Sequence, residues 1–376
     1  MIIKQISTAI VEVPTQRPHK LSLVTFKKIS YVIVRILTDQ GIEGLGEAAI
    51  LGGPAWSEES LESVKSMIDI YLSPILLKEN PMDIERLRAK MDLHYRGNYF
   101  AKAAVEMALF DIVGKAYDLP AYQLLGGFVR DKIQLSWTLA INDADKEIAE
   151  AEYMMEKTGH FMFKYKVGSL PLEKDVERVQ KMRKAHGMNV NLRIDANQGW
   201  NRSMGTKAVR AFEEFNLDFI EQPVPKWDFD GLAAISRTSA TPIMADESNS
   251  LVSDAIQLLK REAASVFSLK VTKAGGLLSS KTIAGMVEWA GYECYIGCMI
   301  ETGIGTAAYL ALGVSSPAVT MGCELFGPLF IVEDIVNEPT EYKDGHILIN
   351  KRPGLGVTIN EKAFNKYLIG SVTHNK

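Results

Sequence analysis

The sequence predicts an α/β fold, a (β/α)7β TIM-like barrel with an α+β capping domain. Apolar runs with strand character recur from residue 130 onward, and amphipathic stretches such as Leu172 to His186 separate them. Before that repeat the order is different, because strands come first and helices follow. The recurring runs are expected to end near Leu139, Lys166, Asp195, Glu221, Asp246, Lys270, Cys298 and Glu324. Eight strands with helical crossovers are typical of a barrel.

The capping domain is expected at residues 1–125. Strands are predicted for Ile6 to Val13, Ser30 to Leu37 and Glu43 to Ala49, with a hairpin signal at Asp39-Gln-Gly41. Helical periodicity follows from residue 57 to about 125. The barrel is expected at 126–350, and the tail, about 351–376, is predicted to return to the capping domain.

An open doubly wound sheet is the alternative for the second domain. Such a sheet is expected to carry a phosphate-binding loop after its first strand. No Gly-x-Gly-x-x-Gly or Walker sequence follows any predicted strand. The barrel is therefore favoured.

The bulk composition is that of a soluble globular enzyme. Hydrophobic residues make up 47% of the 376 residues, charged residues 23%, and the net charge is −4. This charge predicts no nucleic-acid partner. We expect no secretory signal and no membrane span. The three cysteines form no disulfide pattern, which predicts a reducing, cytoplasmic location.

Three acidic residues end three successive predicted strands. Asp195 follows the apolar run that starts at Val190, and Glu221 and Asp246 come after steps of 26 and 25 residues. A single such acid is most often a turn former or a helix N-cap. In a barrel, however, all three would meet at one mouth, where unpaired carboxylates repel each other. A divalent cation resolves this, and all-oxygen ligation favours Mg²⁺ or Mn²⁺.

Lysines end two further predicted strands. Lys164 and Lys166 are two residues apart and therefore point to the same side, although an isolated Lys-x-Lys can also mark a solvated strand face. Lys270 ends the sixth strand, across the mouth from Lys166 on the second. A neighbouring cation or ammonium group would lower a lysine pKa towards the roughly 7–8 that suits a general base. Lys273 is expected to face a helix, without a role.

Together these residues predict proton transfer next to a carboxylate. A cation would hold the substrate carboxylate, and a lysine would move the proton at the adjacent carbon. The enolase superfamily uses this chemistry, with a Lys or His base and Mg²⁺.

At these positions the sequence resembles the muconate-lactonizing branch of the enolase superfamily over essentially its whole length. The superfamily motifs are Lys164-Tyr-Lys166, Asp195-Ala-Asn197-Gln, Ile220-Glu221-Gln-Pro, Met244-Ala-Asp246-Glu-Ser and Leu269-Lys270-Val-Thr-Lys-Ala-Gly-Gly276. Similarity to the muconate cycloisomerases within the branch lies in Arg17-Pro-His-Lys20, Trp137-Thr-Leu-Ala140, Cys323-Glu324-Leu-Phe-Gly-Pro328, Glu333-Asp-Ile-Val-Asn-Glu-Pro339 and Pro353-Gly-Leu-Gly356.

The resemblance implies a role for each site residue. Asp195, Glu221 and Asp246 would bind the metal, and Lys166 and Lys270 would form the acid/base pair. Lys164 would bind the substrate carboxylate and lower the pKa of Lys166. The resemblance also implies Glu324 as the completing residue at the eighth strand. Asn197 lies close to Asp195 in the sequence, so we expect it beside the metal, in contact either with the substrate or with the metal ligands.

The implied enzyme is a cycloisomerase that interconverts cis,cis-muconate, or a close analogue, and muconolactone through an enolate. Its small carboxylate substrate would be selected by capping-domain loops near His19 to Thr25 and Leu51 to Glu59. Leu51 and Trp56 stand where the muconate enzymes carry Ile and Tyr, so they are candidate substrate contacts. The family likeness also implies a homo-oligomer.

Two other functions stay open at this stage. The same lysine pair could racemise or epimerise N-acylated amino acids, for example N-succinyl derivatives. Dipeptide epimerisation is disfavoured, because those enzymes carry Asp-x-Asp on the last strand where this chain has Cys323-Glu324-Leu. A catalytically silent barrel used for binding is the third possibility, and retention of both lysines and all three acids argues against it.

Overall fold

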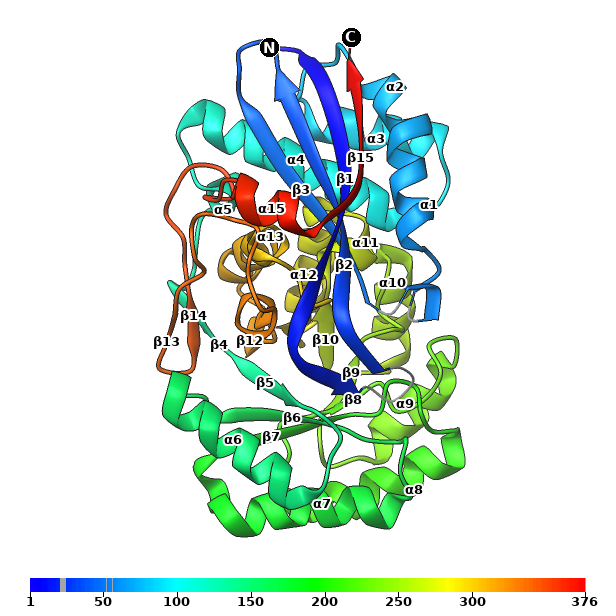
Figure 1. Cartoon of the computed structure of the whole chain (residues 1–376). Coiled ribbons are helices and arrows are strands. Elements are labelled where there is room, and N and C mark those ends of the chain that lie inside the picture. Colours follow the sequence, from blue (N-terminus) through cyan, green and yellow to red (C-terminus); the bar gives the residue numbers. More distant parts are fainter. Residues whose placement is uncertain (21–24, 52, 56, 376) are drawn as a thin grey trace.

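The capping domain is built on a four-stranded antiparallel sheet in the order β15-β1-β2-β3. The computed structural model describes the whole chain except residues 21–24, 52, 56 and 376. The strands of this sheet are β1 (Ile3–Lys20), β2 (Thr25–Thr38), β3 (Glu43–Ile50) and β15 (Leu368–Asn375). Because β15 pairs with β1, the end of the chain returns beside its beginning, and both termini lie at the far end of this domain (Figure 1).

Helix α4 (Tyr99–Tyr117) packs closely on this sheet, and two glycines allow it. A Cβ at Gly44 would lie 2.1 Å from the carbonyl oxygen of Ala108, and one at Gly46 would lie 1.8 Å from that of Ala104. Only glycine fits so near a helix backbone. The other helical segments here are α1 (Leu61–Ser66), the π-helical η2 (Met67–Leu72), α2 (Ser73–Leu76), α3 (Ile84–His94) and α5 (Ala121–Leu124), with a 3-10 turn at η1 (Gly53–Ala55).

Eight parallel strands form the second sheet, in the order of the sequence. They are β5 (Ser136–Leu139), β6 (Met162–Lys166), β7 (Asn191–Asp195), β8 (Ile220–Glu221), β9 (Ile243–Ala245), β10 (Val266–Leu269), β11 (Glu293–Ile296) and β12 (Val319–Cys323). An isolated parallel bridge between Leu135, the residue before the first strand, and Cys323 of the last strand nearly closes the barrel. The predicted fold class is thus confirmed, and the open sheet is excluded.

Helices connect successive barrel strands, and a last short helix follows β12. They are α6 (Ala144–Thr158), α7 (Leu172–His186), α8 (Arg202–Phe212), α9 (Phe229–Thr238), α10 (Val252–Arg261), α11 (Val271–Ala274), α12 (Leu277–Trp289), α13 (Gly303–Ser315) and α14 (Gly327–Phe330), with 3-10 turns η3 (Gly187–Asn189) and η4 (Glu213–Phe215). The tail adds β13 (Tyr342–Lys343), β14 (His346–Leu348) and α15 (Glu361–Tyr367), and β14 pairs with β4 (Lys132–Gln134). Among the described residues, no helix has the length and apolarity that a membrane span requires.

The strands β1 and β2 run from the capping sheet down to the barrel (Figure 1). Their pairing continues as far as His19 with Phe26 and Lys20 with Thr25, beyond a register shift after Pro14. Part of the predicted His19 to Thr25 loop is therefore strand, because the hairpin continues past the shift. This extension carries His19 to the barrel mouth. The predicted boundaries at 125/126 and near 350 stay predictions.

Candidate active site

A row of acidic side chains lies at the carboxyl ends of neighbouring barrel strands. Asp195 ends β7 and Glu221 ends β8, and the parallel register pairs these two residues directly. Asp246 comes immediately after β9. All three are buried, with at most 1% of each residue exposed. Asp195 is no helix cap, since Asn201 caps α8 and one Asp195 oxygen accepts instead from the backbone of Asn197.

Lysine side chains from β6 and from the segment after β10 hold these carboxylates. The Nζ of Lys166 lies 2.5 Å from Oδ2 of Asp195. Lys164 bridges two strands, because its Nζ lies 2.7 Å from Oε2 of Glu221 and 2.6 Å from Oε2 of Glu324. We call the lysine and carboxylate side chains at these strand ends the charged floor. Its members are Lys164, Lys166, Asp195, Glu221, Asp246, Lys270, Lys273 and Glu324.

Asp246 is held by two lysines. The Nζ atoms of Lys270 and Lys273 each lie 2.7 Å from one of its carboxylate oxygens. The expectation that Lys273 faces a helix without a role is wrong. The short helix α11 begins directly after Lys270 and returns the side chain of Lys273, three residues on, to the barrel mouth. Four ammonium groups thus face four carboxylates, with Glu324 as the fourth.

The electrostatics of the row differ from one end to the other. Burial, and then the charge of Asp195, raise the pKa of Glu221 well above its usual range. Burial also works to raise the pKa of Asp246, but the ammonium groups of Lys270 and Lys273 outweigh it, and that pKa is lowered. The middle carboxylate of the row, Glu221, therefore has less positive charge around it than Asp246 has.

Lys164 and Lys270 do not have lowered pKa values, whereas burial lowers the pKa of Lys273. Burial works to lower the pKa of Lys270, but Asp246 and Glu221 raise it above its usual value. Lys164 is raised in the same way by Glu221 and Glu324. The neighbours of these two lysines are carboxylates, which raise the pKa. The expected lowering towards a pKa of 7–8 assumed a neighbouring metal ion and stays a prediction.

The residues of the row fit a divalent cation in their chemistry. Their side chains supply oxygens only, from adjacent strands, and Glu221 shares the ammonium group of Lys164 with Glu324. Over the described part of the chain, however, no acidic, His or Cys side chains are gathered closely enough to form a metal-binding group. The carboxylates have the right chemistry but do not converge on one point, because each is paired with a lysine. Binding a cation would require these ion pairs to loosen.

Asn197 and Glu247 form a second layer beside the row. Asn197 has a positive φ of 42°, and its Nδ2 donates to Oε1 of Glu247 over 3.1 Å. Its Oδ1 has no partner among the described residues. Burial, and then Asp246, raise the pKa of Glu247 to about 7. Sequence reasoning missed Glu247, although the acidic pair Asp246-Glu247 was visible.

A pocket above the floor brings together most of the predicted site residues. It is lined by His19, Leu51, Thr138, Lys164, Lys166, Asp195, Asn197, Lys270, Cys298, Ile300, Glu324 and Phe326. Lys166 and Lys270 reach it from the second and sixth barrel strands, four positions apart, as predicted. Leu51 follows β3 of the capping domain and is buried. The other predicted substrate contact, Trp56, lies outside the described residues.

His19 lines this pocket in its neutral form. Burial, and then the charge of Arg17, lower its pKa well below the usual value. An Nη1 of Arg17 lies 2.8 Å from its Nδ1. Because a guanidinium only donates, Nδ1 accepts and the proton resides on Nε2. Arg17 also donates to the carbonyl oxygen of Thr138 and pairs with Glu150, so the capping hairpin is tied to the barrel here.

Comparison with known proteins places this fold and site in one family. Residues 5–126 match the mandelate racemase / muconate lactonizing enzyme N-terminal domain, and residues 146–363 match the enolase C-terminal domain-like model. The chain belongs to the mandelate racemase / muconate lactonizing enzyme family. It is 39% identical to muconate cycloisomerase 1 of Pseudomonas putida, covering 98% of each chain.

Solved structures of this family superpose closely on the chain. The muconate lactonizing enzyme from Pseudomonas fluorescens complexed with muconolactone gives a TM-score of 0.96 at 39% identity, covering 98% of this chain and 99% of that one. A 2-chloromuconate cycloisomerase from Rhodococcus opacus gives a TM-score of 0.95 at 35% identity, covering 98% of this chain and 100% of that one. The predicted family is confirmed, and the chain is an enzyme of the enolase superfamily.

Proposed function

We propose that the enzyme is a cycloisomerase that interconverts cis,cis-muconate, or a chlorinated analogue, and the corresponding lactone. The observation that carries this proposal is the pocket itself, in which Lys166 and Lys270 face one small space from opposite sides of the barrel. The relatives support it, since they are named muconate and chloromuconate cycloisomerases at 37–39% identity over nearly full length.

Asp195, Glu221 and Asp246 would hold the divalent cation, Mg²⁺ or Mn²⁺. The cation would bind one substrate carboxylate and stabilise the negative charge that develops next to it. In its presence Lys166 and Lys270 would lose their carboxylate partners and become available to the substrate. Loosening of the Lys166–Asp195 and Lys270–Asp246 pairs is the first consequence of this assignment.

In the lactonizing direction, one carboxylate oxygen of the substrate adds to the double bond conjugated with the other carboxylate. A carbon–oxygen bond forms, and the electron pair moves into an enolate next to that second carboxylate. Lys166 or Lys270 then gives a proton to the adjacent carbon, which completes the lactone. In the reverse direction the same lysine removes that proton and the lactone carbon–oxygen bond breaks. Atoms and charge balance without any oxidant or reductant.

Two further residues would orient the dicarboxylate. Lys164, which already bridges Glu221 and Glu324, would provide positive charge at the reacting carboxylate. His19 is neutral, and its Nε2–H is turned away from Arg17, so it would donate a hydrogen bond to the other carboxylate. A homo-oligomeric assembly stays a prediction.

A direct assay tests the proposal. Metal-replete protein is expected to remove the ultraviolet absorbance of cis,cis-muconate and to form a lactone, and a chelator is expected to stop the reaction. No absorbance loss with muconate or 2-chloromuconate would refute it. In that case, solvent deuterium entering the α-carbon of N-succinyl amino acids would identify the racemase instead, and no exchange would leave a binding role.

A further inference from the structure

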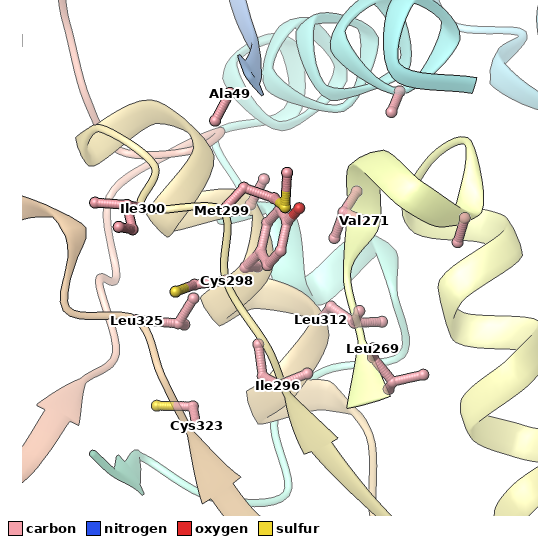
Figure 2. Close-up of a cluster of buried hydrophobic side chains, with 14 of the residues drawn as sticks. Ala49, Leu269, Val271, Ile296, Cys298, Met299, Ile300, Leu312, Cys323 and Leu325 are labelled. Atoms are coloured by element: carbon pink, nitrogen blue, oxygen red, sulfur yellow. The ribbon is translucent and has the colours of Figure 1, made fainter. Parts of the chain in front are cut away.

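Ile300 has a backbone conformation that β-branched residues rarely adopt. Its φ is +59°, in the left-handed region. Such conformations persist only where the surroundings enforce them, and they gather at functional sites. Ile300 is buried and lines the pocket above the charged floor. Figure 2 shows the chain leaving β11 at Ile296, passing Cys298 and then turning, with the side chains of Met299 and Ile300 pointing in different directions.

The capping domain supplies the first bond that enforces this turn. The hydroxyl of Tyr31, on β2, donates to the carbonyl oxygen of Ile300 over 2.9 Å, and the whole Tyr31 side chain is buried. Within the barrel loop, Glu301 accepts from the backbone nitrogen of Met299 over 2.7 Å. The peptide group that follows Ile300 is therefore held by the capping domain, and the peptide group before Met299 is held within the barrel loop.

Glu47, on β3 of the capping domain, supplies a second set of hydrogen bonds that hold this loop. Its carboxylate accepts from the backbone nitrogens of Thr302, over 3.0 Å, and Gly305, over 3.1 Å, and from the hydroxyl of Thr302. It thus caps α13 from another domain and fixes the end of the loop that carries Ile300. A Cβ at Gly305 would lie 3.0 Å from the Glu47 carboxylate, so glycine allows this approach.

Strand β3, which carries Glu47, also leads into Leu51, a residue of the capping domain that lines the pocket together with Ile300. Leu51 lies four residues after Glu47, and Figure 2 shows Ala49, between them, above the loop. We call Leu51, Cys298, Ile300 and Phe326 the apolar wall of the pocket. These four side chains have no carboxylate or ammonium group with which to bind the ends of a dicarboxylate. They are suited to its hydrocarbon middle, where a chlorine or methyl substituent would be carried.

We propose that Ile300 is a specificity-determining residue that limits the size of the substituent on the muconate carbon chain, and that Tyr31 and Glu47 are positioning residues that hold it in place. This inference rests on the proposed function and names the part of the substrate that the apolar wall selects. Removing the Ile300 side chain beyond Cβ would open the wall. Removing the Tyr31 hydroxyl would free the peptide group and let Ile300 retreat from the substrate.

The test compares kcat and KM for cis,cis-muconate and 2-chloromuconate. We expect Ile300→Ala to raise the ratio of kcat/KM for the chlorinated over the unsubstituted substrate about tenfold, because a single extra group in an apolar pocket discriminates by that order. Tyr31→Phe is expected to raise the same ratio about threefold, mainly through KM. Ile300→Val replaces Ile300→Ala if the larger truncation does not fold.

Glu106→Gln provides a matched control. Glu106 is also a fully buried carboxylate of the capping domain, and it accepts over 3.0 Å from the backbone nitrogen of Leu278 at the start of α12, away from Ile300. We expect this variant to lose stability and to keep the wild-type substrate ratio. In contrast, Glu47→Gln is expected to move the ratio in the same direction as Tyr31→Phe.

Equal changes for both substrates in Ile300→Ala would overturn the selectivity role, and an unchanged ratio in both Tyr31→Phe and Glu47→Gln would overturn the positioning role. If the wild type turns over neither substrate, the proposed function fails by itself. Dissociation constants for muconolactone and its chlorinated analogue in the same variants then decide the inference. The same shift in ratio supports it, and no binding or no shift overturns it.

Discussion

The charged floor and the apolar wall surround one pocket but are built in opposite ways. The floor comes from the barrel alone, and its lysines and carboxylates bond to one another at the ends of nearby strands. The wall needs both domains, because Ile300 of the barrel is held by Tyr31 and Glu47 of the capping domain, and Leu51 faces the pocket from that domain. Reaction chemistry and substrate choice are therefore separable by mutation.

Substitutions in the floor should have the largest effect. Lys166→Met and Lys270→Met each remove one of the two proposed acid/base groups, and we expect turnover to fall by roughly 10³-fold or more. Lactone binding should weaken far less, because the cation and Lys164 still hold the carboxylate. Stopped assays with each variant measure the first effect and calorimetric titration with muconolactone the second. Near-normal turnover in either variant would remove that lysine from the mechanism.

Substitution of the proposed metal ligands should give the next largest effect. Asp246→Asn preserves the shape of the side chain but removes its charge, and we expect divalent-cation affinity to drop roughly 100-fold or more, beyond the range typical of outer residues. Glu247→Gln, one position along, is the matched control, and it should lower the cation affinity about tenfold or less. Isothermal titration with Mn²⁺ distinguishes the two. Equal affinities in the two variants would contradict the assignment of Asp246.

His19 lies where floor and wall meet, and its effect should be intermediate. His19→Phe removes the Nε2–H donor, and we expect KM for muconate to rise about tenfold with a smaller change in kcat, as for the loss of a hydrogen bond to a charged group. His19→Asn retains a donor and should recover part of the loss. If His19→Phe lowered kcat alone, His19 would act on the reaction rather than on binding.

The contact between the two domains at Glu47 should show the smallest effect. We expect it to make stability depend on pH. Burial, and then Glu301, raise the pKa of Glu47 to about 8. An unfolded Glu releases its proton near pH 4.3, so between that value and pH 8 the folded chain binds more protons. The free energy of unfolding should therefore fall as pH rises through this window, by at most about 1.4 kcal/mol per pH unit from this group.

Urea unfolding between pH 6 and 8.5 measures this dependence. Glu47→Gln cannot titrate and should have a flatter profile than the wild type. Glu106, whose pKa burial raises to about 7, contributes a slope of the same sign, so the double variant should be flatter still. Stability that rises with pH over this range would contradict both assignments.

The floor was predictable because it follows from periodicity. Strands of a barrel end at one mouth, so the spacing of Asp195, Glu221 and Asp246 was enough to bring them together, with Lys166 and Lys270 on opposite sides. The fold class followed from the same repeat. Lys273 escaped this reasoning, because its place depends on the single turn α11, which periodicity does not resolve.

The wall was not predictable in the same way. Its geometry depends on contacts between residues more than 250 positions apart, such as Tyr31 with Ile300 and Glu47 with Thr302. Nothing in the local sequence around Ile300 signals a positive φ, since glycine and asparagine are the residues that usually indicate it. The neutral state of His19 likewise depends on Arg17 and the buried setting, and the sequence gives only their proximity.

The most direct test of the account is to convert cis,cis-muconate in D₂O with metal-replete protein and to examine the lactone by NMR. Protonation by a floor lysine predicts one deuterium on the carbon next to the free carboxylate, delivered to a single face. Lys166→Met or Lys270→Met, whichever lysine is the donor, should form no deuterated product. A lactone without deuterium, or with deuterium on both faces equally, would contradict the account.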